Sequence, residues 1–227
     1  MSMDHILVVN SGMSSLLTMR EFAWPLQRAL QFPSTVVPIS KLGKKHVRPA
    51  RAIIFSGCPV QDFTYEAHVK RLAWLRNVDI PMVGICAGQQ FLARLFGARV
   101  KARKVPLIGM NLIRKKGNFP FLENVPSSIR VYSLHAKEVT LPSVSSTSPA
   151  PFIPLSASSS PPSSSILFKG AFLCFSSPSC PISGFVHPQK RILGLSFHPE
   201  VGHPYIIRDF MDWAINNSPL PARTGRK

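Results

Sequence analysis

Two kinds of apolar pattern follow one another along the first hundred positions: short continuous runs and longer segments with helical spacing. Short continuous apolar runs, each typical of a buried strand, lie at residues 5–9, 35–39, 51–55 and 81–85. Segments 14–30 and 63–77 carry apolar residues at helical spacing, and Pro25 should kink or break the first helix. This order predicts an α/β fold, with a central, mostly parallel sheet flanked by helices on both faces.

The pattern changes after Gly97. Shorter alternating stretches predict strands of a mixed or antiparallel extension at 109–114, 130–141, 166–175 and 191–197. An amphipathic pattern then predicts a last helix at 204–216. We expect a single domain over residues 1–217, followed by a basic tail at 218–227.

One segment inside this domain has a different composition. Residues 142–165 contain 11 Ser and 6 Pro in 24 positions and no charge. Such a segment buries too little apolar surface to offset the entropy lost on ordering. We therefore expect a disordered Ser/Pro-rich insertion.

Composition narrows the class of protein. The apolar group makes up 45% of the 227 residues, enough for a core, and no run of 18 apolar residues predicts a membrane span. No secretory signal is visible, and four scattered cysteines do not form a disulfide framework, so we expect a cytoplasmic protein. The 27 Lys and Arg against 10 Asp and Glu, a net charge of +17, suggest an acidic partner.

The most informative stretch is G-I-C-A-G-Q-Q at 84–90. Its first two residues end the apolar run 81–85, and the rest opens a helical pattern that ends at Gly97. This is the strand–turn–helix setting of a nucleophile elbow, with Cys86 in the nucleophile position. The helix N-terminus would stabilise a Cys86 thiolate. The alternative is a structural cysteine buried in a glycine-rich turn.

A thiolate nucleophile needs a base and a group that orients the base. The predicted strand at 191–197 leads directly into His198, Pro199 and Glu200. Pro199 restricts the backbone, so His198 and Glu200 have limited relative positions. We predict a triad in which His198 takes the Cys86 proton and Glu200 holds the imidazole.

Together, G-I-C-x-G-x-Q after a buried strand and the late F-H-P-E resemble the class I glutamine amidotransferases. The S-G-C-P run at 56–59 stands where that family has S-G-G-P. The resemblance covers residues 5–141 and 166–216. Within the family, residues 119–139 and the C-P-I run at 180–182 are similar to the stand-alone glutaminase subunit of GMP synthase.

This resemblance implies a flavodoxin-like fold and a reaction. Cys86 would attack the side-chain amide of glutamine, forming a γ-glutamyl thioester and releasing ammonia. Two sets of residues would surround the substrate. The oxyanion hole would use backbone N–H groups at Ala87, Gly57 and Cys58. Substrate contacts would come from Gln90, Leu134 and His135.

The sequence departs from the family at several of these positions. Cys58 replaces the second glycine of S-G-G-P, and it would be strained if that position needs a positive φ. Leu134 and Lys137 stand where the GMP synthase pattern has Ser and Asp, and the loop 10–13 also differs. These changes leave the triad intact and bear on the subfamily and on activity in isolation.

The sequence indicates no resident cofactor or metal. Cys174 and Cys180 lack zinc-knuckle spacing, and no G-x-x-x-x-G-K-[ST] run is present to cradle ATP. An amidotransferase delivers its ammonia to an acceptor, so the resemblance implies glutamine as substrate and a separate ATP-using synthetase as partner.

Two alternatives stay open at this stage. One is a free-standing γ-glutamyl hydrolase with the same triad. The other is a non-catalytic protein that binds nucleic acid through its basic surface, although no nucleic-acid motif is visible. No acid lies between Asp79 and Glu123, and this stretch carries the basic residues Arg94, Arg99, Lys101, Arg103, Lys104, Arg114, Lys115 and Lys116. We expect this face to border the active site and to dock an acidic partner subunit or a nucleotide-bearing surface.

Overall fold

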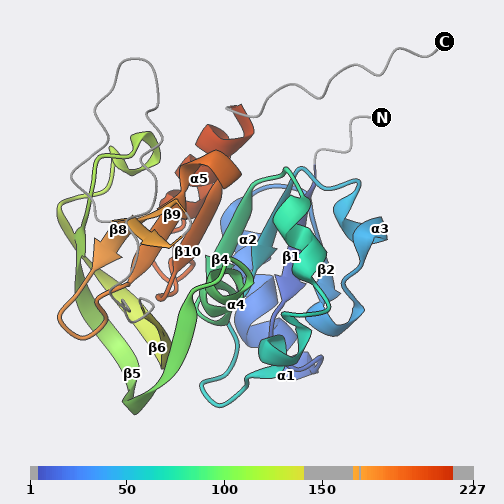
Figure 1. Ribbon diagram of the computed structural model, residues 1–227, viewed down its shortest axis with the longest axis horizontal. Coiled ribbons are helices and arrows are strands. Elements are labelled where there is room, and N and C mark those ends of the chain that lie inside the picture. Colours follow the sequence, from blue (N-terminus) through green and yellow to red (C-terminus); the bar gives the residue numbers. More distant parts are fainter. Residues whose placement is uncertain (1–4, 141–165, 169, 217–227) are drawn as a thin grey trace, which may run out of the picture.

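A ten-stranded mixed sheet organises the computed structural model, which describes residues 5–140, 166–168 and 170–216 (Figure 1). The strands are β1 Ile6–Asn10, β2 Ser34–Pro38, β3 Ala52–Phe55, β4 Met82–Ile85, β5 Arg99–Lys115, β6 Ser128–Thr140, β7 Ile166–Phe168, β8 Ala171–Ser176, β9 Gly184–His187 and β10 Ile192–Leu195. Their order is β2-β1-β3-β4-β10-β9-β8-β5-β6, and β7 pairs with β8. The predicted insertion at 142–165 and the tail at 218–227 lie outside the described residues.

The first five strands of this order are parallel, and all of them except the edge strand β2 are fully buried. Side chains alternate along β1, so Ile6 and Val8 join one core cluster while Leu7 and Val9 join the other. Helices α2 (Trp24–Leu30) and α5 (Tyr205–Asn216) cover the first face, and α4 (Ala87–Leu95) covers the second. The predicted α/β architecture is thus confirmed.

The helical predictions need two corrections. Segment 63–77 is not an α-helix but two 3₁₀ turns, Thr64–His68 and Ala73–Asn77. Its apolar residues still face the sheet, while the Arg71 guanidinium bonds the carbonyls of Ile39 and Leu42, which ties the segment to its neighbours. Pro25 does not break segment 14–30, because it lies in the first turn of α2, where a missing N–H costs little.

The short helices and strand edges also differ from prediction in detail. Segment 14–30 begins with α1 (Leu16–Thr18) and passes through a π-helical turn, Met19–Ala23. A short helix α3 (Lys44–Val47) and strand β9 were not predicted. Strand β5 is far longer than the predicted 109–114, because it runs as a ribbon with β6.

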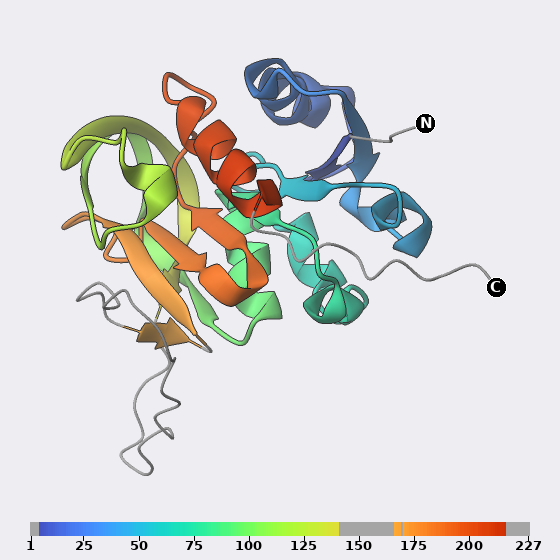
Figure 2. The same cartoon turned by 90° about the horizontal axis from the view of Figure 1, so that it is seen from above.

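The antiparallel half of the sheet curls back toward the parallel half (Figure 2). Strand β6, the last in the sheet order, returns to the end of β10, where Ser133 forms a bridge with Phe197. The His198 N–H donates to the Tyr132 carbonyl at 2.8 Å. This curl places the middle of β6 over the carboxyl ends of β4 and β10.

Among the described residues, no helix combines the length and the apolar character that crossing a bilayer requires.

A close approach between α4 and β3 generates a prediction. A Cβ at Gly88 would lie 2.2 Å from the Phe55 carbonyl oxygen, a backbone atom that cannot move aside. We expect Gly88→Ala to lower the free energy of unfolding by about 1–3 kcal/mol, measured by urea denaturation. Gly43→Ala is the matched control, since a Cβ there meets nothing within 4 Å. Equal stability of the two variants would contradict this packing.

Candidate active site

Cys86 occupies a strained turn between β4 and α4. Its backbone has φ 53° and ψ −107°, which residues with a side chain rarely adopt. The Cys86 N–H donates to the Leu195 carbonyl at 2.7 Å, and the Gly88 N–H donates to the Ser56 carbonyl at 3.2 Å. A strained residue held at this point, with its side chain at the start of a helix, has the form of a nucleophile elbow.

His198 and Glu200 form a buried pair beside this turn. The His198 Nδ1 lies 2.7 Å from Glu200 Oε1, and each side chain is 4% exposed. Gly57 packs against the imidazole, where a Cβ would lie 2.5 Å from His198 Cε1. The ring therefore has one orientation, fixed by Glu200 on one side and by Gly57 on the other.

The protonation of His198 follows from these neighbours. Burial acts to lower the pKa of the imidazole, but the Glu200 carboxylate and the Cys86 sulfur together outweigh it and raise the pKa well above its usual value. Since Nδ1–H donates to Glu200, the other nitrogen is left for proton transfer. His198 Nε2 is buried and has no hydrogen-bond partner among the described residues.

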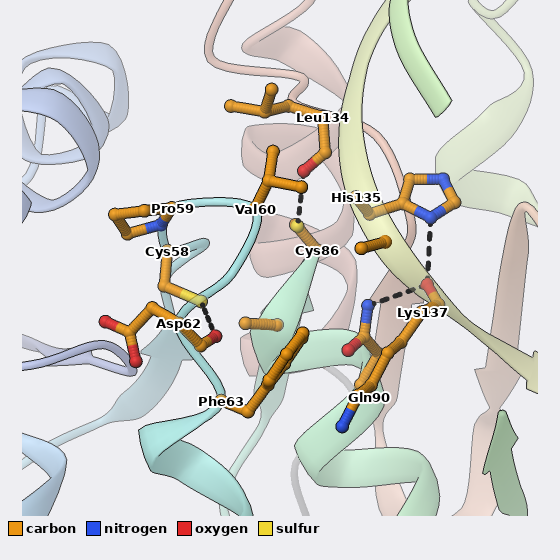
Figure 3. A pocket seen from close by; sticks show the side chains of 12 residues that line it. Cys58, Pro59, Val60, Asp62, Phe63, Cys86, Gln90, Leu134, His135 and Lys137 are labelled. Carbon is orange, nitrogen blue, oxygen red and sulfur yellow. Dashed lines mark hydrogen bonds between the residues drawn. The ribbon is translucent and has the colours of Figure 1, made fainter. Parts of the chain in front are cut away.

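The Cys86 thiol points toward β6. Its Sγ donates to the Leu134 carbonyl oxygen at 3.2 Å (Figure 3). Leu134 thus enters the site through its backbone carbonyl rather than its side chain. The structure brings Cys86, His198 and Glu200 together around one point at the carboxyl edge of the sheet.

A small pocket opens over Cys86 (Figure 3). Three elements build it: the loop after β3, the start of α4 and the middle of β6. Its lining includes the predicted site residues Cys58, Cys86, Ala87, Gln90, Leu134 and His135. Gly57 lies behind this lining, against His198.

Cys58 is buried in the loop after β3. Its thiol donates to the Asp62 carbonyl at 2.9 Å. Burial raises the pKa of Cys58, and the nearby Cys86 and Asp62 raise it further, so this thiol stays neutral. Among described residues other than glycine, positive φ occurs at Gln31, Cys86 and Arg191. The strain expected from replacing glycine by Cys58 is therefore absent.

Gln90 is anchored at both ends of its side-chain amide. Its Oε1 accepts from the Tyr65 hydroxyl at 2.5 Å, and its Nε2 donates to the Lys137 carbonyl at 3.0 Å. His135 Nδ1–H donates to the same carbonyl at 2.8 Å. These bonds hold Gln90 and β6 in fixed positions on the pocket wall.

Sequence reasoning missed several wall residues. The Lys137 Nζ lies 2.6 Å from Glu66 Oε1 and 3.7 Å from the centroid of the Phe63 ring. Arg94 also pairs with Glu66, at 3.6 Å. The one available signal was Lys137, which stands where the GMP synthase pattern has Asp. Nothing in the sequence pointed to Tyr65, since its role depends on a 3₁₀ turn packing against α4.

No group of three His, Cys, Asp or Glu residues in the described part of the chain is placed to hold a metal ion.

The comparison with protein families decides the assignment. Residues 26–210 match the family model for class-I glutamine amidotransferases. The chain belongs to this family. The match spans both the Cys86 turn and the His198–Glu200 pair.

Individual relatives of this amidotransferase carry GMP synthase names. A glutamine-hydrolyzing GMP synthase subunit of Pyrococcus furiosus is 26% identical over 195 residues, covering 82% of this chain and 88% of that protein. The corresponding subunit of Thermoplasma volcanium is 26% identical over 204 residues, covering 90% and 87%. The GMP synthase of Geobacillus kaustophilus is 27% identical over 180 residues, which are 74% of this chain but 30% of that longer protein.

Solved structures agree on the fold. A crystal structure assigned to a GMP synthase subunit of Thermoplasma acidophilum has a TM-score of 0.70 at 24% identity, covering 94% of each chain. A glutamine amidotransferase of Thermotoga maritima has a TM-score of 0.60 at 18% identity, covering 92% of this chain and 82% of that one. The predicted fold class and the prediction of a glutamine amidotransferase enzyme are confirmed.

The buried histidine on the pocket wall generates a prediction about acid stability. Burial is the main cause that lowers the pKa of His135 from 6.5 to about 4. A group whose pKa falls on folding stabilises the protein above its unfolded pKa, and this stabilisation is lost as pH falls from 6.5 to about 4. We expect a loss of about 3 kcal/mol in unfolding free energy from this group across that range.

The comparison uses His135→Asn, which keeps a donor near the Lys137 carbonyl and removes the titration. Denaturation midpoints of both proteins should be measured from pH 8 to pH 4. The stability difference between wild type and variant should shrink with falling pH. His198, whose pKa is raised, stabilises below its unfolded pKa and does so in both proteins. A pH-independent difference would contradict the assignment.

Proposed function

We propose that this amidotransferase hydrolyses glutamine through Cys86, His198 and Glu200 and passes the ammonia to a separate ATP-using synthetase, that of GMP synthase. The observation that carries the proposal is a strained cysteine at a helix start, beside a buried histidine–carboxylate pair with a free Nε2. Support for the partner comes from relatives named as subunits of GMP synthase. In one relative the matched region is less than a third of a longer chain.

The reaction begins with proton transfer from the Cys86 thiol to His198 Nε2. The sulfur attacks the side-chain carbonyl carbon of glutamine, and the N–H groups of Ala87 and Cys58 receive the resulting oxyanion. His198 returns the proton to the leaving nitrogen, so ammonia departs and a γ-glutamyl thioester remains. His198 then accepts a proton from water as the water attacks the thioester, and it returns this proton to the leaving Cys86 sulfur. Glutamate is released and the Cys86 thiol is regenerated.

Each supporting residue has a stated task in this scheme. Glu200 accepts the Nδ1–H bond and stabilises the imidazolium that forms in both halves of the reaction. The bond from the Cys86 thiol to the Leu134 carbonyl must break before the proton can reach His198. The substrate's α-amino and carboxylate groups lie along β6 at Leu134 and His135, with Gln90 at their side.

Cys86→Ala tests the proposal. Ammonia and glutamate release should be measured from glutamine, with and without the GMP synthase synthetase of the same organism and ATP. We expect the variant to lose activity by at least about 10⁴-fold, since the nucleophile is absent. Cys174→Ala, a buried cysteine on β8 outside the pocket, is the matched control and should retain activity.

Two other sets of results would contradict this proposal or favour a different function. Retained hydrolysis in Cys86→Ala, or none by wild type in any mixture, would refute the triad. Full activity without a partner, together with cleavage of larger γ-glutamyl amides, would favour a free-standing γ-glutamyl hydrolase.

A further inference from the structure

Strand β5 exposes an unusual amount of apolar surface. Four of the nine large apolar side chains that are exposed in the described part of the chain lie on it: Val105, Ile108, Met110 and Leu112. Their exposed fractions range from 55% to 72%. Ile108, Met110 and Leu112 alternate along the strand, so their side chains share one face. Contiguous exposed apolar groups of this kind mark interaction sites.

Strand β6 extends the apolar area. In the antiparallel register Ile108 lies opposite Leu134, and Met110 lies opposite Tyr132. Residues directly opposite in such a pair project on the same side of the sheet. Leu134 and Tyr132 are half-buried. The five residues Ile108, Met110, Leu112, Tyr132 and Leu134 form what we call the ribbon face.

The ribbon face is continuous with the active site. The Leu134 carbonyl accepts a hydrogen bond from the Cys86 thiol, and Leu134 lines the pocket. The Tyr132 ring lies 6.3 Å from the His198 ring between centroids, and its carbonyl accepts the His198 N–H. A partner seated on this face would therefore lie beside the point where ammonia is released.

Charge indicates the character of that partner. Arg130 lies opposite Leu112, and Arg114 follows Leu112 on the same side of β5; both are exposed. A second copy of this chain, at a net charge of +17, would bring like charges together. A protein with an apolar patch ringed by acidic residues satisfies both the apolar and the basic groups.

The basic face predicted from the sequence needs refinement, because some of its residues form ion pairs within the chain. The Arg103 side chain is only 16% exposed. It pairs with Glu138 and donates to the Ser179 carbonyl, so its contacts stabilise the fold itself. Lys101 pairs with Glu138 as well, at 3.2 Å. Arg114 and Arg130 are therefore the more direct candidates for contact with an acidic partner.

We propose that the ribbon face is the docking surface for the ATP-using synthetase, which contacts it with an apolar patch and an acidic rim. This inference rests on the proposed function for the identity of the partner. Because Leu134 belongs both to the face and to the pocket, docking acts on the strand that holds the Cys86 thiol.

The test is a binding measurement with the triple variant Ile108→Thr, Met110→Thr, Leu112→Thr. Threonine suits an exposed strand, so the melting temperature should stay unchanged. The probe is the GMP synthase synthetase of the same organism, and Kd is measured by calorimetry. We expect Kd to rise about 10- to 100-fold, while basal hydrolysis stays the same.

Two further variants sharpen the result. Leu16→Ser with Leu17→Ser is the matched control, since both leucines are equally exposed but lie on α1, away from β5 (Figure 1). Its Kd should match wild type. Arg114→Glu is a second variant that keeps the strand intact, and it should weaken binding most at low salt.

Several outcomes would overturn the proposal: an unchanged Kd in the triple variant, an equal loss in the α1 control, or no binding by wild type. Self-association that the triple variant abolishes would also overturn it, in favour of a second copy. Repeating the titration with Cys86→Ala separates the two proposals. A Cys86→Ala chain that binds but still hydrolyses glutamine refutes the triad and leaves the docking surface standing.

Discussion

The curl of the sheet is the constraint on which the site depends. A flat sheet would leave β6 far from β10, since β9, β8 and β5 separate them in the strand order. The bridge between Ser133 and Phe197 and the bond from the His198 N–H to the Tyr132 carbonyl close that gap. They place the Leu134 carbonyl of β6 against the Cys86 thiol and complete the third wall of the pocket.

Within that frame, the electrostatics of the site are kept local. The Glu200 carboxylate is buried beside the imidazole that it stabilises. The two groups therefore interact mainly with each other and little with the basic surface. A second pair, Lys137 with Glu66, closes the far wall. The excess of positive charge lies outside this enclosure. Arginines beside an apolar strand face suit association with another protein better than they suit the chemistry of glutamine, which is a net-neutral zwitterion.

The glycines show how narrowly the parts fit. Gly88 lets α4 approach the backbone of β3, and Gly57 makes room for the His198 ring. Both positions exclude a side chain, because the Phe55 backbone or the His198 ring occupies the space. By contrast, Cys58 is accommodated where the family pattern has glycine, because its backbone lies outside the positive-φ region and its thiol finds a carbonyl acceptor.

Local patterns were enough to identify the parallel strands, the Cys86 turn and the F-H-P-E run, because burial periodicity and turn chemistry depend on neighbours in the chain. Other features depend on residues far apart in sequence. The Tyr65–Gln90 bond and the Lys137–Glu66 pair arise only when the 3₁₀ turn Thr64–His68 packs against α4 and β6. The ribbon face also required the register of β5 on β6, since sequence alternation alone does not say which side stays uncovered.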